Sequence, residues 1–155
     1  MDIERAKMVA GDIICRAEAA YLTTMGENGL PTTRAMLNLH APERYPALVP
    51  IFAAMQSKGE IYFTTNSSSR KVGQLQRDAR TAVYYCLPGE WTGLCLSGVL
   101  ELVTDRQLKE RLWQPAWAMY YPAGPDDLEY AILRLCPTQA ELYHQLDGAK
   151  WEPGA

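Results

Sequence analysis

The spacing of apolar residues predicts one helix at the start of the chain, followed by a series of short strands. Asp2 can cap this helix, because its side-chain oxygen can accept a free N–H group of the first turn. The apolar stripe of the helix comprises Ile3, Ala6, Ala10, Ile13, Ile14 and Ala17. Apolar and β-branched runs then predict strands over residues 21–25, 32–39, 61–63, 81–87, 94–103 and 131–135, which residues 140–144 can extend after Pro137.

Glycine and proline separate these elements. Residues 26–29 read G-E-N-G and predict a turn, and residues 88–90 predict another. Gly98 interrupts an apolar run and indicates a bulge, a bend or the close approach of another group. The stretch 40–57 contains three prolines and predicts only a short helix over residues 51–55.

The C-terminal third begins with a second helix signal. Residues 104–107 read T-D-R-Q, fit a capping box and predict a helix that continues to Trp113. The stretch 113–121 is rich in aromatic residues, which is typical of a core or a subunit contact. The tail from Gln145 is predicted to be irregular, with Trp151 as its anchor.

The most informative stretch is residues 60–80. An apolar run at 61–63 predicts a strand, and the six small polar residues 64–69 predict a loop after it. The next apolar positions recur at the spacing of a helix and are Val72, Leu75 and Ala79. The segment therefore predicts a strand, a polar loop and a helix.

The start of that helix carries an unusual charge. Ser68 or Ser69 would cap it, and Arg70 and Lys71 would lie in its first turn, where the helix dipole favours anions instead. Two interpretations follow: an anion such as a phosphate lies in front of the helix, or the charges are incidental on a capped surface helix. The sequence motifs of nucleotide-binding P-loops and of dinucleotide-binding folds are absent.

Arg34 is the other cation of interest, because it lies within an apolar strand. Its stem can pack on the sheet at the rim, or its guanidinium can point at a ligand. His40 and His144 lack metal-ligand spacing and are expected to be surface or structural residues, and no metal site is predicted. No catalytic triad pattern is present, so any catalysis is expected to come from a bound cofactor.

The bulk properties narrow the class further. The 155 residues are expected to form a single domain over 1–155, and 48% of them are apolar. A net charge of −3 gives no reason to expect nucleic acid. The sequence contains no apolar run long enough for a membrane span and no signal peptide, so a cytoplasmic location is expected, without membrane contact. The four cysteines are expected to be reduced core residues, with Cys86 and Cys95 as the one pair to check for a disulfide.

Two motifs carry a family resemblance. Residues 63–71 read F-T-T-N-S-S-S-R-K, and residues 32–37 read T-T-R-A-M-L. Together they resemble the pyridoxamine 5′-phosphate oxidase-like flavoproteins. Residues 96–105 and 112–127 are similar to the general-stress-protein branch of that family, and the similarity extends from about Ala20 to His144.

This resemblance implies a mainly β fold, a split β-barrel with flanking helices, that binds FMN. It also implies a homodimer with the FMN sites at its interface. Carried over by position, the residues implied to bind FMN are Arg34, Ala35, Met36, Leu37, Thr64, Thr65, Ser69, Arg70 and Lys71. Of these, Ser69, Arg70 and Lys71 would hold the phosphate.

The sequence departs from the true oxidases at their substrate site. Leu39 stands where those enzymes have a lysine. Their C-terminal arginine and histidine motif is absent after Tyr143. Tyr143 itself is near the position of the family's late tryptophan. The resemblance therefore implies an FMN-dependent oxidoreductase acting on an unknown small molecule, and not on pyridoxamine phosphate. The alternative is a non-catalytic flavin-binding general stress protein. A deazaflavin or haem ligand on the same barrel is a third reading.

Overall fold

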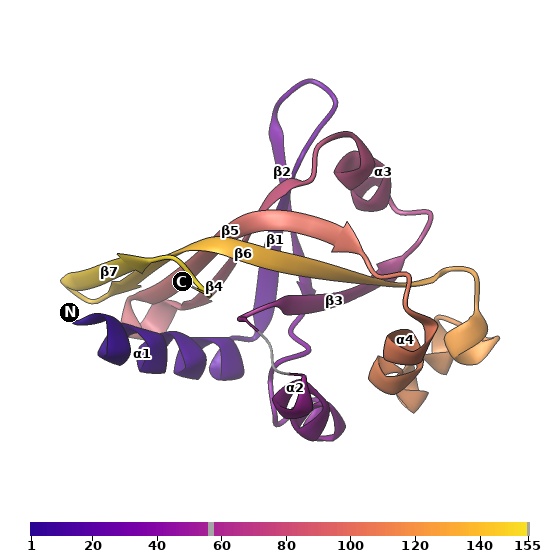
Figure 1. Ribbon diagram of the computed structural model, residues 1–155, viewed down its shortest axis with the longest axis horizontal. Coiled ribbons are helices and arrows are strands. Elements are labelled where there is room, and N and C mark those ends of the chain that lie inside the picture. The colour runs from indigo at the N-terminus through magenta and orange to yellow at the C-terminus, as the bar shows by residue number, and fades with distance from the viewer. Residues whose placement is uncertain (56–57, 155) are drawn as a thin grey trace.

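Among residues 1–55 and 58–154, which the computed structural model describes, seven strands form one antiparallel sheet with helices around it (Figure 1). The strands are β1 (Ala19–Met25), β2 (Pro31–Leu37), β3 (Ile61–Asn66), β4 (Arg80–Leu87), β5 (Thr92–Leu102), β6 (Tyr130–His144) and β7 (Asp147–Trp151). The α-helices are α1 (Ile3–Arg16), α2 (Val49–Ala54), α3 (Arg70–Arg77) and α4 (Arg106–Leu112). Short 3₁₀ turns are η1 (Pro46–Leu48), η2 (Pro88–Glu90), η3 (Pro115–Met119) and η4 (Gly124–Asp126).

The sheet is curved into a partial barrel. Its strand order is β2-β1-β4-β5-β6-β3, and β7 pairs with β6. The two end strands, β2 and β3, come into contact with each other although they are last in this order. The expected mainly β class with flanking helices is therefore confirmed. The line where β2 meets β3 is called the seam below.

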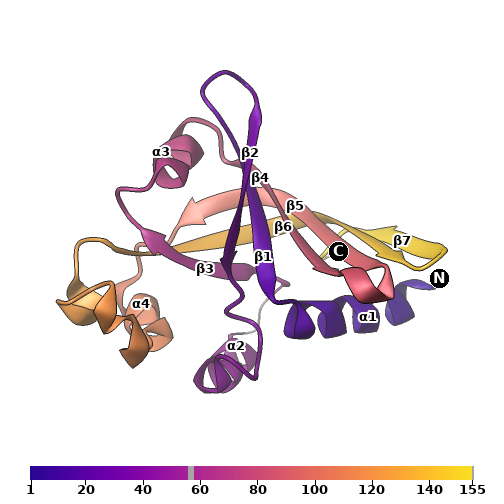
Figure 2. The ribbon, with the colours of Figure 1, turned by 180° about the vertical axis from the view of Figure 1, so that it is seen from behind.

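Helix α1 covers one end of the sheet. Asp2 caps it by accepting a hydrogen bond from the N–H of Arg5 at 2.9 Å, as predicted. Ala6, Ala10 and Ile13 are buried against the sheet, whereas Ile3 at its start stays partly exposed. Figure 2 shows α1 beside the β7 end of the sheet, and α3 and α4 at the opposite end.

The core has two parts because β3 and β6 are buried on both faces. The larger cluster lies inside the curved sheet and includes Phe63 and Tyr85. The smaller cluster lies between the outer face of β3 and β6 and the segments around η1, α4 and η3, and includes Trp117 and Tyr130. Strands buried on both faces read as continuous apolar runs, which is why their sequences show no clean alternation.

Several boundaries differ from the sequence prediction. Strand β3 continues through Asn66, so the first half of the predicted polar loop belongs to the sheet. Helix α3 ends at Arg77, which leaves Ala79 outside it. Helix α4 is capped by Asp105, whose carboxylate accepts from the N–H groups of Gln107 and Leu108, and not by the predicted Thr104. Strand β2 ends at Leu37, two residues earlier than expected.

The tail was predicted to be irregular, and this prediction is wrong. Residues 147–151 form β7, which pairs with β6, and Trp151 packs against the larger core cluster as expected. Gly98 lies at a register shift between β5 and β6, in agreement with the predicted bulge. A Cβ atom on Gly98 would lie 2.0 Å from the carbonyl oxygen of Cys136, so only glycine fits at this position.

The cysteines are free, but the prediction that they are core residues is wrong. Cys15 is exposed, and the other three are partly exposed. Cys86 pairs with Gly93 across the sheet, and Cys95 pairs with Tyr84. The Tyr84 side chain lies over Gly93, where an added Cβ would be 2.1 Å from its hydroxyl. The tyrosine therefore lies between the two cysteines, which form no disulfide.

No helix in the described part of the chain is both long and apolar enough to cross a membrane.

Candidate cofactor site

A cavity of about 340 Å³ lies at the seam, between the two end strands and the aromatic segment. It is called the seam cavity, and its lining residues are Ala35, Met36, Leu37, Thr64, Thr65, Asn66, Ser69, Lys71, Trp117, Tyr120 and Tyr121. Strand β2 supplies one wall and β3 supplies the opposite wall. The start of α3 and the η3 segment close the two remaining sides.

The edge of β3 offers free main-chain groups to this cavity. The N–H of Tyr62 points away from β6, because it donates to Nε2 of His40 at 3.1 Å. Main-chain groups alternate in direction along an antiparallel strand. The N–H and C=O groups of Thr64 therefore also point away from β6, toward the open edge where Thr64 lines the cavity. They can pair with the polar edge of a flat ligand.

Three cations converge near the start of α3. The ammonium group of Lys71 donates to the Thr65 hydroxyl at 2.9 Å. Burial and then the nearby Arg34 lower the pKa of Lys71, while burial and then Arg70 lower the pKa of Arg34. Among the described residues, no aspartate or glutamate forms an ion pair with any of these three side chains. The positive charge is uncompensated, which favours an anionic ligand.

Arg34 is held by a buried polar pair that the sequence analysis missed. Its guanidinium donates to the Thr24 hydroxyl at 2.7 Å and to Oε1 of Gln74 at 3.3 Å. The Thr24 hydroxyl in turn donates to the same Gln74 oxygen at 2.6 Å. Thr24 and Gln74 are both buried. Arg34 is thus fixed behind the seam, between β1 and α3, and does not line the seam cavity.

Glu129 holds the loop that precedes α3. Its carboxylate accepts hydrogen bonds from the hydroxyls of Ser68 at 2.6 Å and Ser67 at 3.3 Å. Ser69 has the extended conformation of an N-cap, but its side chain makes no capping hydrogen bond, contrary to the prediction, and Ser68 does not cap the helix either. The Ser69 hydroxyl makes only a long contact of 3.5 Å with the Thr65 hydroxyl, and the N–H groups of Arg70 and Lys71 have no partner among the described residues. These groups therefore remain available for a ligand.

The aromatic wall combines fixed and open rings. Trp117 and Tyr121 are buried, and the Tyr121 hydroxyl donates to Oδ1 of Asn66 at 3.0 Å. Tyr120 is 63% exposed beside the cavity. The hydroxyl of Thr64 is buried near the Tyr121 side chain but has no hydrogen-bond partner of normal geometry among the described residues. A buried hydroxyl without a partner is unfavourable, so a ligand group at this wall would relieve its cost.

Seven of the nine sequence-predicted site residues line the seam cavity. The two exceptions are Arg34, which lies behind it, and Arg70. Arg70 faces a second depression of about 710 Å³, called the turn groove, between the β1–β2 turn and α3. The sequence predicts Trp113, Tyr120 or Tyr143 as possible walls for a molecule that stacks on the flavin, and of these only Tyr120 is among the residues that line the seam cavity. The residues that sequence reasoning missed are Thr24, Asn66, Gln74, Trp117, Tyr121 and Glu129. For Trp117 and Tyr121 the signal was the aromatic richness of residues 113–121, which is also typical of a core or a subunit contact.

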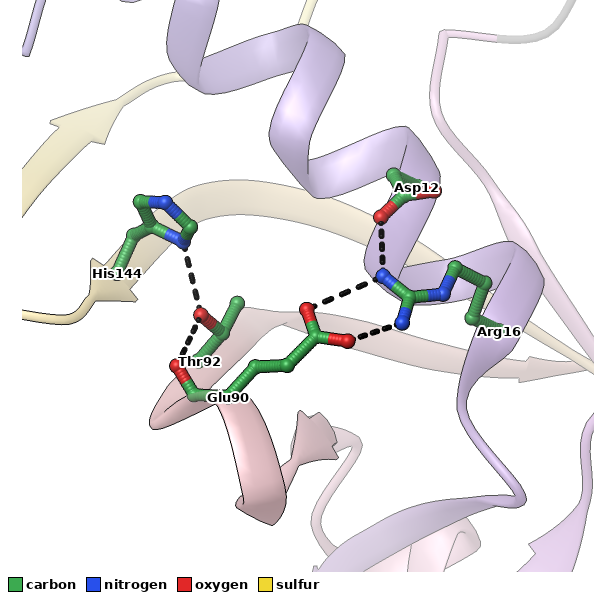
Figure 3. A network of polar contacts seen from close by, with 5 residues as sticks. All are labelled: Asp12, Arg16, Glu90, Thr92 and His144. Carbon is green, nitrogen blue, oxygen red and sulfur yellow. Dashed lines mark hydrogen bonds and ion pairs between the residues drawn. The ribbon is translucent and has the colours of Figure 1, made fainter.

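A separate polar network away from the seam cavity is structural. His144 pairs through Nδ1 with the Thr92 hydroxyl at 2.8 Å, and Arg16 bridges Asp12 and Glu90 (Figure 3). This network ties α1 to η2 and to the end of β6. Within the described residues, no group of three His, Cys, Asp or Glu side chains could hold a metal ion.

Comparison with known families gives a match over most of the chain. The family described as "Pyridoxamine 5'-phosphate oxidase like" matches residues 12–150. The chain belongs to this family. A comparison with curated proteins gives no significant match.

Solved structures agree with the fold. The chain is similar to a protein from Clostridium acetobutylicum related to general stress protein 26 of Bacillus subtilis, with 26% identity, a TM-score of 0.78, and coverage of 98% of this chain and 96% of that one. An FMN-binding protein related to pyridoxamine 5′-phosphate oxidase from Nostoc punctiforme has 15% identity and a TM-score of 0.64, covering 100% and 99%. A haem-binding protein from Mycobacterium smegmatis has 14% identity and a TM-score of 0.65, covering 93% and 56%.

Proposed function

We propose that the protein binds FMN in the seam cavity, with the FMN phosphate at the start of α3. The observation that carries this proposal is the group of three cations without an acidic partner beside a cavity with an aromatic wall. Membership of the family supports it, as does the FMN-binding protein from Nostoc punctiforme among the similar structures.

The residues present suit the parts of FMN. Lys71, the Ser69 hydroxyl and the free N–H groups of α3 match a phosphate, because charged donors and a helix start both favour an anion. The edge groups and the buried hydroxyl of Thr64 match the polar edge of the flavin ring. Tyr120, which lines the cavity, would pack on a ring face.

We further propose that the protein is an oxidoreductase acting on a small molecule. Bound FMN supplies the redox chemistry, since its isoalloxazine ring accepts and donates electrons. The protein's own residues would bind the cofactor, orient it and shield one side of it from water. Pyridoxamine phosphate is not the expected substrate. Leu39, at the position of the family's lysine, is buried in the smaller core cluster and offers no cation to a second phosphate.

The binding test is a titration of the purified apoprotein with FMN, followed by flavin fluorescence. Changing both Arg70 and Lys71 to Ala should weaken FMN binding at least 100-fold, since charge-assisted hydrogen bonds contribute about 1.5–3 kcal/mol each. The matched control changes Arg5 and Lys7 to Ala on α1, far from the cavity, and should leave the affinity unchanged. Riboflavin lacks the phosphate and should be affected little by either double variant. An unchanged FMN affinity in the Arg70 and Lys71 variant would refute the site.

The activity test uses FMN-loaded protein with reduced nicotinamides and, separately, with pyridoxamine 5′-phosphate under air. Reduction of the bound flavin by a nicotinamide supports the oxidoreductase. Tight FMN binding without any reduction would favour the alternative, a non-catalytic flavin-binding stress protein. Turnover of pyridoxamine phosphate at roughly 1 per second or faster, an ordinary enzymatic rate, would contradict the proposed substrate class.

We also propose a homodimer with the FMN sites at its interface. Tyr21 and Tyr84 are direct neighbours across β1 and β4, and they are 39% and 43% exposed. Ala35 pairs with Tyr21 on the other side, so the same exposed face of the sheet continues to the seam cavity. A second copy on this face would cover aromatic surface and border the cavity. Light scattering should give twice the monomer mass at micromolar concentration, and a monomer with bound flavin would contradict the proposal.

The four free cysteines suit a reducing compartment, which supports the cytoplasm as the place where this protein acts.

A further inference from the structure

The turn groove adjoins the proposed phosphate position. It lies between the β1–β2 turn and α3, and its lining residues are Gly26, Glu27, Asn28, Thr32, Ser68, Ser69, Arg70, Gly73, Gln74 and Arg77. Ser69 lines both the seam cavity and this groove. A group that leaves the phosphate on the side away from the flavin ring would therefore enter the groove.

The charges of the groove favour an anion there. Arg70 is exposed, faces the groove and forms no ion pair with a described residue. Arg77 is paired with Glu27 at 2.8 Å across the far end of the groove. Three of the lining residues carry charge. Glu27 and Arg77 are paired, which leaves Arg70 as the one cation of the groove without an ion pair among the described residues.

The floor of the groove is kept clear by a glycine. Gly73 lies in the middle of α3, where its φ angle does not require glycine, and a Cβ atom there would meet nothing within 4 Å. Glycine inside a helix costs about 1 kcal/mol relative to alanine. Helix stability and packing therefore give no reason for glycine at this position, and a side chain much longer than alanine would extend into the groove.

Gln74 adds a buried donor to the same surface. The residue is only 8% exposed, and its Oε1 atom accepts hydrogen bonds from Thr24 and Arg34. Because Arg34 can only donate, these contacts fix the orientation of the amide. The Nε2 group is then turned away from Arg34, and it makes no hydrogen bond with any described residue although Gln74 lines the groove.

We propose that the turn groove binds a second phosphate group joined to the first, so that the protein also takes a flavin carrying a diphosphate, of which FAD is the available example. Arg70, which would border the first phosphate and also faces the groove, and the Gln74 amide are the donors for this second phosphate. None of the described residues that line the groove is aromatic, so the adenosine part is held by polar contacts without ring stacking. The inference rests on the proposed FMN site through the shared Ser69.

The test compares FMN and FAD by calorimetric titration of wild type, Gly73→Ala and Gly73→Gln. Wild type should bind FAD within tenfold of its FMN affinity. Gly73→Gln fills the groove without adding charge and should weaken FAD at least tenfold, while FMN changes less than threefold. Gly73→Ala is the matched control that keeps the groove open and should behave as wild type with both ligands.

FAD that binds wild type more than tenfold more weakly than FMN, or FAD binding unaffected by Gly73→Gln, would overturn the groove site while leaving the FMN site intact. Inorganic pyrophosphate and phosphate separate the two proposals further. Pyrophosphate should bind wild type at least tenfold more tightly than phosphate, and Gly73→Gln should remove this advantage. If that pattern holds in a protein that fails to bind FMN, the proposed function is wrong and the groove remains an anion site.

Discussion

Replacing Tyr85 with phenylalanine should stabilise the protein. Tyr85 is 0% exposed inside the larger core cluster, and its hydroxyl makes no hydrogen bond with any described residue. Burial raises the pKa of this phenol, in keeping with its apolar surroundings. A buried hydroxyl without a partner carries a desolvation cost of about 1–3 kcal/mol, which the variant would remove.

The small void left by the oxygen offsets part of this gain. At about 24 cal/mol per Å³, a space of roughly 10–15 Å³ costs about 0.3 kcal/mol. The net gain in the free energy of unfolding is therefore about 1–2 kcal/mol. For a chain of this length, each kcal/mol corresponds to a rise in the melting temperature of roughly 2–4 °C.

Tyr130→Phe is the matched control, since Tyr130 is also buried but its hydroxyl donates to the carbonyl oxygen of Lys109 at 2.8 Å. That variant should lose about 1–2 kcal/mol, because a paired hydrogen bond is removed. Urea and thermal unfolding of the apoproteins, followed by circular dichroism, measure both changes. If Tyr85→Phe is less stable than wild type, the Tyr85 hydroxyl is satisfied in solution and the reasoning fails.

Two further stability predictions concern His40 and the glycines. Burial lowers the pKa of His40 to about 4. As the pH falls from about 6.5 toward 4, the unfolded chain therefore takes up a proton before the folded protein does. The free energy of unfolding should drop by at most about 3 kcal/mol over this range. His40→Gln should flatten this pH dependence in urea unfolding at pH 7, 5 and 4, whereas an equally steep loss in the variant would assign it to other groups. Gly98→Ala should cost roughly 3 kcal/mol or prevent folding, because its Cβ would meet the carbonyl oxygen of Cys136 at 2.0 Å. Gly73→Ala, where nothing clashes, should be at least as stable as wild type in the same urea assay, and equal behaviour of the two variants would contradict this account.

The local signals in the sequence located most strands and the first helix, because capping residues and apolar runs act over a few neighbours. Asp2 and the bulge at Gly98 are examples. The tail was missed because β7 is polar and partly exposed, and its pairing with β6 supplies a stability that no local pattern reveals. Thr64 and Thr65 read as loop residues for the same reason, although β6 holds them in the sheet.

The candidate site was predictable in part. The motif around Ser69 and Lys71 identified one wall of the seam cavity, and Ala35 to Leu37 identified the opposite wall. Thr24 and Gln74 could not be found, since their role depends on how α3 packs against β1. Glu129 lies 61 residues beyond the serine that it holds, so its part in fixing the loop follows only from the tertiary fold.

The pairing of β3 with β6 also has a consequence for the order of assembly. Residues 61–66 carry one wall of the seam cavity, yet their partner strand begins only at Tyr130. A chain emerging from the ribosome therefore cannot complete this wall until β6 has been synthesised, and contacts so distant in sequence form slowly. Flavin captured by this cavity would accordingly stabilise the finished fold against unfolding and would not act as a template for the early steps of folding.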